Sequence, residues 1–292
     1  MTRCGFVAAA GRPNAGKSTL VNAIVGGKVA IVSDKPQTTR RAIRGIATRD
    51  DWQLVLVDMP GVQRPRDALT ERMQRRVQRE LGDSDAALFV VNGEQAVGPG
   101  DRFIARALKN AQRPCVTAVN KIDLLDPGRT AAALAAAGNL GVQGEIFPVS
   151  ARTGAGVPEL VEALVALLPE GPFLYPPEEQ SDLPERVRLA ELIREQVLLR
   201  TREELPHAVE VEIEELEDRG GQLVVEARIW AESESQKAIL IGAGGRMVKA
   251  VGTAARKEIE SAIGRRVHLE LTVRVRKGWR RDDGLLDRLG IE

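Results

Sequence analysis

The chain has 292 residues, a length that predicts about two domains. Its 42 basic and 41 acidic residues give a formal net charge of +1, which excludes a uniformly basic nucleic-acid binder but allows one basic face. Two cysteines and two histidines, all in strand-like runs, offer little basis for a disulfide framework, a zinc site or a catalytic triad. The N-terminus does not read as a signal peptide, and no apolar run reaches the roughly 18 residues of a membrane span, so we expect a cytoplasmic protein.

The first ~170 residues alternate short apolar runs with polar, Arg- and Ala-rich stretches such as Leu69–Leu81 and Asp101–Asn110. The apolar runs read as five buried strands: Phe6–Ala10, Leu54–Val57, Ala86–Val91, Cys115–Val119 and Ile146–Val149. Strands that alternate with helices predict an α/β domain whose mostly parallel sheet is covered on both faces.

A Pro-rich, acidic stretch separates this part from the rest of the chain. It contains Pro169, Pro172, Pro176, Pro177 and Pro184, and such a sequence cannot continue a helix. We interpret it as a semi-rigid linker. The predicted organisation is a first domain at 1–170, a linker at 171–184 and a second domain at 185–292.

The second domain has a different order of predicted helices and strands. Its predicted order is helix, strand, strand, helix, helix, strand, with the segments Glu185–Thr201, Ala208–Glu217, Gln222–Trp230, Ser235–Ile241, Arg246–Ile263 and Val267–Val275. A tight turn at Asp218–Gly221 joins the first two strands, and Gly242–Gly245 separates the last two helices. This mixed order predicts an α+β domain.

A phosphate-binding loop follows the first strand. Residues Gly11–Ser18 match the pattern G-x-x-x-x-G-K-[ST], and the helical segment Thr19–Val25 comes next. Its glycines let backbone N–H groups and the helix N-terminus face phosphate oxygens. We expect Lys17 to reach the β- and γ-phosphates and Ser18 to ligate Mg²⁺.

The sequence Asn120-Lys121-Ile122-Asp123, which follows the strand Cys115–Val119, identifies the base. Asp123 can accept hydrogen bonds from N1–H and the 2-amino group of guanine, a pair of donors that adenine lacks. Asn120 and Lys121 shape the pocket. The order of the motifs therefore predicts guanine nucleotides as ligands.

Two further motifs complete the nucleotide site. Asp58-Met59-Pro60-Gly61 follows a predicted strand, so that Asp58 can hold Mg²⁺ through water and the Gly61 N–H can sense the γ-phosphate. Ser150-Ala151-Arg152 follows another strand, and its backbone N–H groups can contact the guanine O6. Either fragment alone is a common loop sequence. Their order in the chain and their position directly after predicted strands indicate that they belong to the nucleotide site.

These motifs resemble the translation-factor-related GTPases, and the whole chain resembles the Era family. Gln37-Thr38-Thr39-Arg40 is similar to the first switch of that family, which implies that Thr39, with Thr38 as the alternative, closes over Mg²⁺. The family usually has Thr after the switch Asp, where this chain has Met59. The resemblance implies GTP hydrolysis, assistance to small ribosomal subunit assembly and binding to the 3′ end of 16S ribosomal RNA. It also implies a monomer with peripheral membrane association.

Val62 follows Gly61 where Ras-like proteins have a water-positioning Gln, so we expect slow intrinsic hydrolysis. In similar GTPases an Asn at the position of Asn14 helps to hold K⁺ against the phosphates, which makes K⁺ a candidate cofactor beside Mg²⁺. Arg40, Arg41 and Arg44 are possible arginine fingers with no sequence feature that selects one.

The segment Gly242–Gly245 resembles the G-x-x-G loop of KH domains, and the predicted element order resembles the bacterial KH type. Such loops clamp about four nucleotides of single strand by the backbone. Ala243 and Gly244 stand where a basic residue is usual. Basic side chains on the next helix and near the C-terminus favour an RNA track: Arg246, Lys249, Arg256, Lys257, Arg274, Arg276, Lys277, Arg280 and Arg281. Trp279 either stacks a base or packs the tail.

The predicted function is a GTP-hydrolysing switch that binds single-stranded RNA, with GTP or GDP as ligand. The predicted catalytic residues are Lys17, Thr39 and Gly61, and the predicted Mg²⁺ ligands are Ser18, Thr39 and Asp58. The predicted nucleotide-binding residues are Gly11, Asn14, Ala15, Gly16, Lys17, Ser18, Thr19, Asp58, Gly61, Asn120, Lys121, Asp123, Ser150, Ala151 and Arg152. The predicted RNA-binding residues are Gly242, Ala243, Gly244, Gly245, Arg246 and Lys249. A metabolic phosphotransferase lacks an acceptor-pocket motif here, and the intact phosphate loop argues against a vestigial nucleotide domain.

Overall fold

The computed structural model describes residues 2–35, 37–61, 66–201 and 205–291. It divides into two compact units, which are treated separately below. The first unit comprises Met1–Val32, Thr39–Arg66 and Thr70–Asp182, and the second comprises Ser33–Thr38, Asp67–Leu69 and Leu183–Glu292. Among the described residues, no helix combines the length and the apolar composition that a membrane crossing requires.

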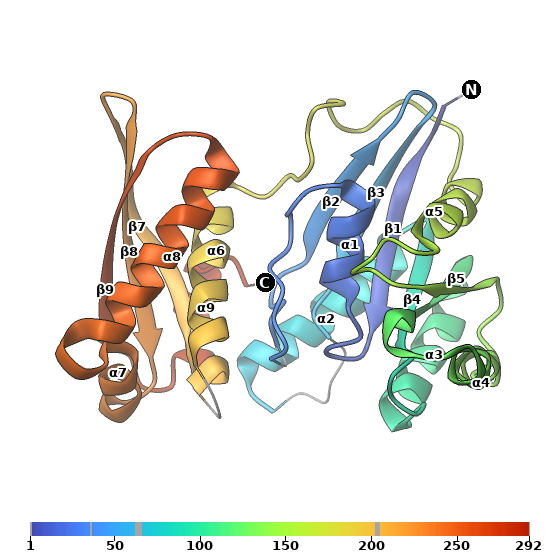
Figure 1. The fold of residues 1–292 in the computed structure, drawn as a ribbon, viewed down its shortest axis with the longest axis horizontal. Coiled ribbons are helices and arrows are strands. Elements are labelled where there is room, and N and C mark those ends of the chain that lie inside the picture. The colour runs from blue at the N-terminus through green and yellow to red at the C-terminus, as the bar shows by residue number, and fades with distance from the viewer. Residues whose placement is uncertain (1, 36, 62–65, 202–204, 292) are drawn as a thin grey trace. The chain divides into compact units, whose positions relative to one another are not determined.

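A twisted sheet of six strands forms the centre of the first unit (Figure 1). The strands are β1 (Arg3–Gly11), β2 (Ile43–Thr48), β3 (Trp52–Asp58), β4 (Ala86–Asn92), β5 (Cys115–Asn120) and β6 (Ile146–Val149). Their order is β2-β3-β1-β4-β5-β6, with β2 antiparallel to β3 and the other pairs parallel. The mostly parallel sheet is therefore confirmed, and only the edge strand β2 was not predicted.

Helices cover both faces of this sheet. The bounds are α1 (Lys17–Val25), α2 (Ala68–Asp83), α3 (Pro99–Ala111), α4 (Pro127–Gly138) and α5 (Val157–Ala166). Alternate residues of β1 enter different cores, because successive side chains of a strand point to opposite faces. Val7 and Ala9 pack with α1 and α5, whereas Ala8 and Ala10 pack with α2 and α3.

The end of the predicted linker lies along the edge strand β2. The Ile46 N–H donates to the Gln180 carbonyl at 2.8 Å, and Arg44 pairs with Asp182 at 2.8 Å. The buried amide of Gln53 accepts from the N–H groups of Leu174 and Tyr175 at 2.8 and 2.9 Å. Residues up to Asp182 therefore belong to the first unit, since they complete its otherwise open sheet edge.

The second unit follows the predicted order of elements. It contains α6 (Glu185–Arg200), β7 (Glu210–Arg219), β8 (Gln222–Ala231), α7 (Glu234–Ile241), α8 (Arg246–Ile263), β9 (Val267–Val275) and α9 (Asp283–Arg288). The strand β8 pairs antiparallel with β7 and parallel with β9. Apolar side chains from α6, α7, α8 and one face of this sheet form the core. The helix α9, which the sequence patterns did not predict, has Leu285 and Leu286 fully buried.

Short 3₁₀ helices occur at Ile122–Leu124, Leu205–Ala208, Ala243–Gly245 and Trp279–Arg281. The first lies in the predicted base-binding motif and the third in the G-x-x-G loop.

Candidate nucleotide and RNA sites

The phosphate loop joins β1 to the N-terminus of α1. Gly16 has φ 91°, a left-handed conformation, and a Cβ there would lie 2.2 Å from the Asn120 Nδ2 atom. Both the backbone conformation and the lack of space beside Asn120 therefore exclude a side chain at this position. The loop leaves the first N–H groups of α1 directed at its own concave side, the arrangement that binds phosphate.

Lys17 lies inside this loop with 7% of its surface exposed. Its ammonium donates to the Gly11 and Arg12 carbonyls at 3.2 Å each. Burial lowers the pKa of Lys17, while the negative charge of Asp58 acts in the opposite direction. A further anion, such as a nucleotide phosphate, would stabilise a buried cation of this kind.

Three side-chain oxygens meet beside Lys17. Ser18 Oγ donates to Asp58 Oδ2 at 2.6 Å, and Thr39 Oγ1 lies 3.1 Å from Ser18 Oγ and 3.2 Å from Asp58 Oδ2. The hydroxyl of Thr38 instead donates to the Lys35 carbonyl at 2.6 Å. Of the two candidate threonines, Thr39 thus lies with the predicted Mg²⁺ ligands. Two hydroxyls and a carboxylate are a hard, all-oxygen donor set, which fits Mg²⁺.

The base-binding motifs are connected to the phosphate loop by hydrogen bonds. Asn120 donates through Nδ2 to the Ala15 carbonyl at 3.0 Å and accepts through Oδ1 from the Ala151 N–H at 2.9 Å. Ser150 Oγ donates to Asp123 Oδ1 at 2.7 Å, which orients the carboxylate. Asn120 is 2% exposed, so these bonds form in the interior, and one side chain links three loops that are far apart in sequence.

Met59 and Gly61, which follow Asp58, have packing roles. Met59 is fully buried in the apolar core between the sheet and α2 and α3, an environment that suits a thioether at this position. A Cβ at Gly61 would lie 2.8 Å from Pro13 Cγ, so this glycine lies against the phosphate loop. Val62, on which the expectation of slow hydrolysis depends, lies outside the described residues.

None of the three arginines considered as fingers is a free surface cation. Arg44 pairs with Asp182 and lies 5.6 Å from the centre of the Phe6 ring. The hydrogen bond with Asp182 raises the pKa of Arg44. Arg40 and Arg41 are 2% and 8% exposed.

The structure adds a pair that the motifs did not reveal. Arg12 of the phosphate loop donates through Nε to Asp101 Oδ1 at 2.9 Å, and Asp101 is fully buried in the first turn of α3. The other oxygen of Asp101 accepts from the Gly98 N–H at 2.8 Å. Arg12 and Asp101 are 89 positions apart, and nothing in the sequence connects them.

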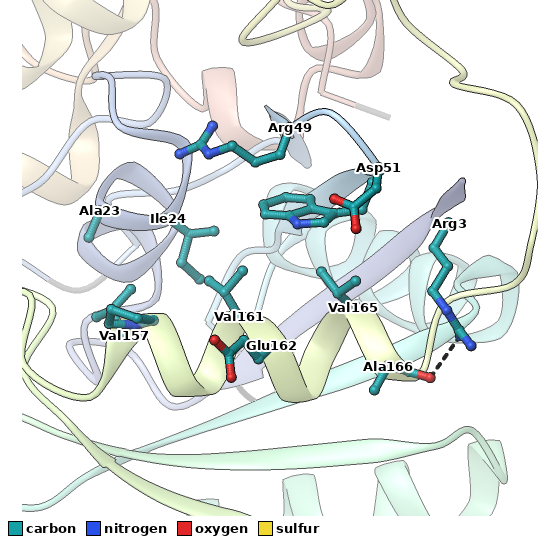
Figure 2. A pocket seen from close by; sticks show the side chains of 12 residues that line it. Arg3, Ala23, Ile24, Arg49, Asp51, Val157, Val161, Glu162, Val165 and Ala166 are labelled. Atoms are coloured by element: carbon teal, nitrogen blue, oxygen red, sulfur yellow. Dashed lines mark hydrogen bonds between the residues drawn. The ribbon is translucent and has the colours of Figure 1, made fainter. Parts of the chain in front are cut away.

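A cavity of about 700 Å³ also lies in the first unit, between α5 and the residues Ile24 and Trp52 (Figure 2). Val161 and Val165 of α5 form its apolar floor. None of the residues predicted to bind nucleotide lines it, so this cavity is separate from the phosphate loop.

In the second unit, the G-x-x-G loop joins α7 to α8. Gly242, Gly244 and Gly245 all have positive φ, at 71°, 59° and 78°. A Cβ added to Gly244 or Gly245 would meet no atom within 4 Å, so the outer side of the loop is open. Gly245 is the N-cap of α8, and the first N–H groups of that helix are directed at this open side.

A cavity of about 350 Å³ lies between α8 and β9. Its lining is Val248, Lys249, Gly252, Thr253, Arg256, His268, Leu269 and Leu271. Lys249 was a predicted RNA contact, and Arg256 belonged to the predicted basic track. Sequence reasoning missed Gly252, whose Cβ would lie 3.4 Å from Leu271 Cδ1. His268, which carried no functional prediction, is exposed at the surface and also lines this groove.

The basic residues near the C-terminus divide into two groups. Arg276 pairs with Asp282, and Arg280 pairs with Asp67 at 2.7 Å and donates to the His207 carbonyl. Arg274, Lys277 and Arg281 are exposed. Trp279 is fully buried and donates to the Ala208 carbonyl at 2.9 Å, so it packs the tail and does not offer a stacking surface.

Comparison with known proteins assigns a family to each of the two domains. A family described as 50S ribosome-binding GTPase matches residues 6–121, and a KH domain family matches residues 204–280. GTPase Era of Nocardioides sp. is 47% identical over 99% of this chain and 96% of its own length. GTPase Era of Mycobacterium avium is also 47% identical, over 99% of both chains.

Two solved structures resemble the chain along its length. One is Aquifex aeolicus Era bound to GDP and AlF₄⁻, with a TM-score of 0.95, 34% identity and 99% coverage of both chains. The other is Era in complex with MgGDPNP and nucleotides 1506–1542 of 16S ribosomal RNA, with a TM-score of 0.96, 34% identity and coverage of 100% of this chain and 99% of that one. On these similarities and the site geometry, the chain belongs to the Era family of GTPases.

Proposed function

We propose that this chain is a GTP-hydrolysing switch that binds single-stranded ribosomal RNA through its KH domain and assists assembly of the small ribosomal subunit. The RNA would be the 3′ end of 16S ribosomal RNA, as in the similar Era complex. The cytoplasm as its location and the monomeric state are part of the proposal. K⁺ dependence through Asn14 is also part of it, and peripheral membrane association stays an expectation from the family resemblance.

The observation that carries the proposal is the hydrogen-bonded connection between the two halves of the nucleotide site. Asn120 fixes the phosphate loop at Ala15 and the base loop at Ala151, and Ser150 orients Asp123. A carboxylate held in one orientation can accept from both guanine donors, whereas adenine would leave it without them. This arrangement favours GTP over ATP.

The hydrolytic chemistry rests on charge neutralisation. The Lys17 ammonium and the N–H groups at the start of α1 face the position of the phosphates, where negative charge develops during phosphoryl transfer. Ser18, Thr39 and Asp58 are the residues that would hold Mg²⁺, which supplies further positive charge at the β- and γ-phosphates. Because Thr39 belongs to the first switch, its position depends on the nucleotide state.

RNA binding rests on the open G-x-x-G loop and the adjoining groove. Glycines without side chains let a phosphate approach the N–H groups at the start of α8, and Lys249 and Arg256 supply positive charge along the groove. The groove wall of Leu269 and Leu271 is apolar, which suits the faces of unpaired bases.

The test is a steady-state GTP hydrolysis assay on the full chain, with and without single-stranded RNA that carries the 3′-terminal 16S sequence. We expect slow Mg²⁺-dependent turnover of GTP, no turnover of ATP, and a change in rate when RNA is added. The variant Asp123→Asn serves as the control, because it should lose GTP turnover while its KH domain still binds RNA. Equal turnover of ATP and GTP would contradict the proposal, and so would phosphoryl transfer to an acceptor other than water.

A further inference from the structure

The exposed side of α3 carries two charge placements that lower the stability of the helix and one exposed aromatic ring. Arg102 lies in the first turn, where the helix dipole disfavours a cation. Arg106 follows at the i+4 position, and like charges at that spacing repel. Phe103 is 53% exposed, and among the Phe, Tyr and Trp side chains that the structure describes it is the only exposed one.

The charge on this side of α3 is not balanced locally. Lys109 and Arg113 are also exposed, and the one acidic residue of the helix, Asp101, is fully buried and bound to Arg12. The neighbouring helix α2 also has exposed arginines, Arg75 and Arg79, but it carries acidic residues as well, and its Arg76 pairs with Glu80 at 2.8 Å. For a chain whose net charge is only +1, the cluster of cations on α3 is a local concentration.

The buried side chains of α3 account for its packing against the sheet, but they do not account for the residues on its exposed face. Ile104, Ala105 and Leu108 are buried in the core against the sheet, so α3 needs no further apolar side chain for its stability. Arg102, Phe103 and Arg106 are all exposed, and the i,i+3 spacing of Phe103 and Arg106 and the i,i+4 spacing of Arg102 and Arg106 make these pairs neighbours on the solvent side of the helix. An aromatic ring flanked by two guanidinium groups is the combination that binds unpaired nucleic acid, with a base on the ring and phosphates on the cations.

We propose that Arg102, Phe103 and Arg106 form a second contact site for single-stranded RNA, on the GTPase domain and separate from the G-x-x-G groove. Phe103 stacks one base, and the two arginines bind the phosphates on either side of it. The site depends on the proposed function only in that both concern RNA, and its residues do not belong to the nucleotide site. Lys109 and Arg113 extend the positive charge toward the C-terminal end of α3.

The experiment removes RNA binding by the KH domain and measures the RNA binding that remains. In the full chain with Gly245→Asp, a labelled single-stranded RNA should still bind weakly, with a strong dependence on salt. Adding Arg102→Gln with Arg106→Gln should weaken this residual binding at least tenfold. The control is Arg129→Glu, which changes the net charge by the same two units at an exposed position on α4 and should leave the binding unchanged.

Stacking is measured separately with RNA that contains a fluorescent adenine analogue, whose emission falls when it stacks. In the Gly245→Asp background, Phe103→Ala should abolish this decrease and Phe103→Tyr should retain it. Thermal melting of each variant checks folding. If Gly245→Asp does not fold, the pair Lys249→Gln and Arg256→Gln gives an alternative background with a weakened KH groove.

Three results would overturn the site on α3. They are no residual binding at low salt in the KH-deficient background, equal weakening by the Arg129→Glu control, and displacement of the RNA by polyglutamate as readily as by unlabelled RNA. The last result would indicate an acidic protein as partner. If Gly245→Asp instead binds RNA like the parent, the KH part of the proposed function fails, while the α3 variants still decide the second site.

Discussion

In the nucleotide site, side chains hold the loops together, whereas in the KH domain the G-x-x-G loop is shaped mainly by its backbone. Asn120, Ser150, Asp58 and Thr39 each form side-chain hydrogen bonds to another loop or helix of the first unit. The G-x-x-G loop has three glycines at positive φ, a turn hydrogen bond from the Gly245 N–H to the Gly242 carbonyl, and open space beside Gly244 and Gly245.

The two sites should therefore respond differently to mutation. Removing one side chain from the nucleotide site leaves partners unsatisfied in other loops, so the damage spreads. Adding one side chain at Gly244 or Gly245 should block the approach of phosphate without a clash with the rest of the domain. The following variants test this contrast, in order of the expected effect.

The largest effect is expected for Asp123→Asn. The amide can donate where the carboxylate only accepted, so it no longer matches the two donors of guanine. GTP affinity should fall by at least roughly 10³-fold, and xanthosine triphosphate should bind better than GTP. Competition binding with GTP, XTP and ATP measures this preference. Unchanged GTP affinity would show that Asp123 does not contact the base.

Gly245→Asp should weaken RNA binding by on the order of 10²-fold, since several phosphate contacts are lost together. GTP binding should stay near that of the parent. Gly245 has φ 78°, so part of the loss can come from backbone strain. The matched variant Gly245→Asn tolerates the same φ without the charge, and titration of labelled RNA at two salt concentrations separates the two causes. Parent-like binding by a folded Gly245→Asp protein would mean that the loop is only a helix break.

Asp101→Asn tests whether the buried pair with Arg12 supports the phosphate loop. The loss of a buried, charge-assisted bond should destabilise the protein by about 1–3 kcal/mol and weaken GTP binding by roughly tenfold. Melting with and without GTP measures both effects, and RNA binding serves as the unaffected control. If the melting temperature falls while GTP affinity stays constant, the pair stabilises α3 but does not position the loop.

Gly252→Ala should act in opposite directions on stability and on binding. Alanine in a helix interior stabilises by about 0.5–1 kcal/mol relative to glycine. Its Cβ, however, enters the groove 3.4 Å from Leu271 Cδ1 and should weaken RNA binding by several-fold. Gly252→Leu should weaken RNA binding further, by about 1–3 kcal/mol, the typical free energy of one base contact. A more stable variant with unchanged RNA affinity would place the RNA outside this groove.

The smallest effect concerns K⁺ and Asn14. Turnover of GTP should be a few-fold faster in K⁺ than in Na⁺ at matched ionic strength, and loss of the Asn14 side chain should remove the difference. Asn14 has φ 62°, which Asn tolerates better than most residues, so Asn14→Ala also changes the backbone energy. Asn14→Gly removes the side chain without this strain. Equal rates in both salts for the parent and both variants would eliminate the cation role.

The sequence determined the parts of this protein that depend on residues close together in the chain. The phosphate loop, the Asn-Lys-x-Asp motif, the Asp-x-x-Gly motif and the G-x-x-G loop are short patterns whose chemistry resides in backbone conformation and a few adjacent side chains. The α/β order of the first domain and the element order of the KH domain followed from hydrophobic periodicity, which is also local.

Only the tertiary structure decided questions that depend on contacts between distant segments. Thr38 and Thr39 are chemically equivalent in the sequence, and the position of Asp58 on β3 distinguishes them. Trp279 is buried where its ring N–H can donate to the Ala208 carbonyl, a residue far from it in the sequence. Gly252 lines a groove only because α8 packs beside β9. Arg12 and Asp101 form an ion pair only because the fold brings the phosphate loop next to the start of α3. A sequence pattern states which residues are neighbours along the chain, but the direction of a side chain and the identity of its partner are fixed by how strands and helices pack.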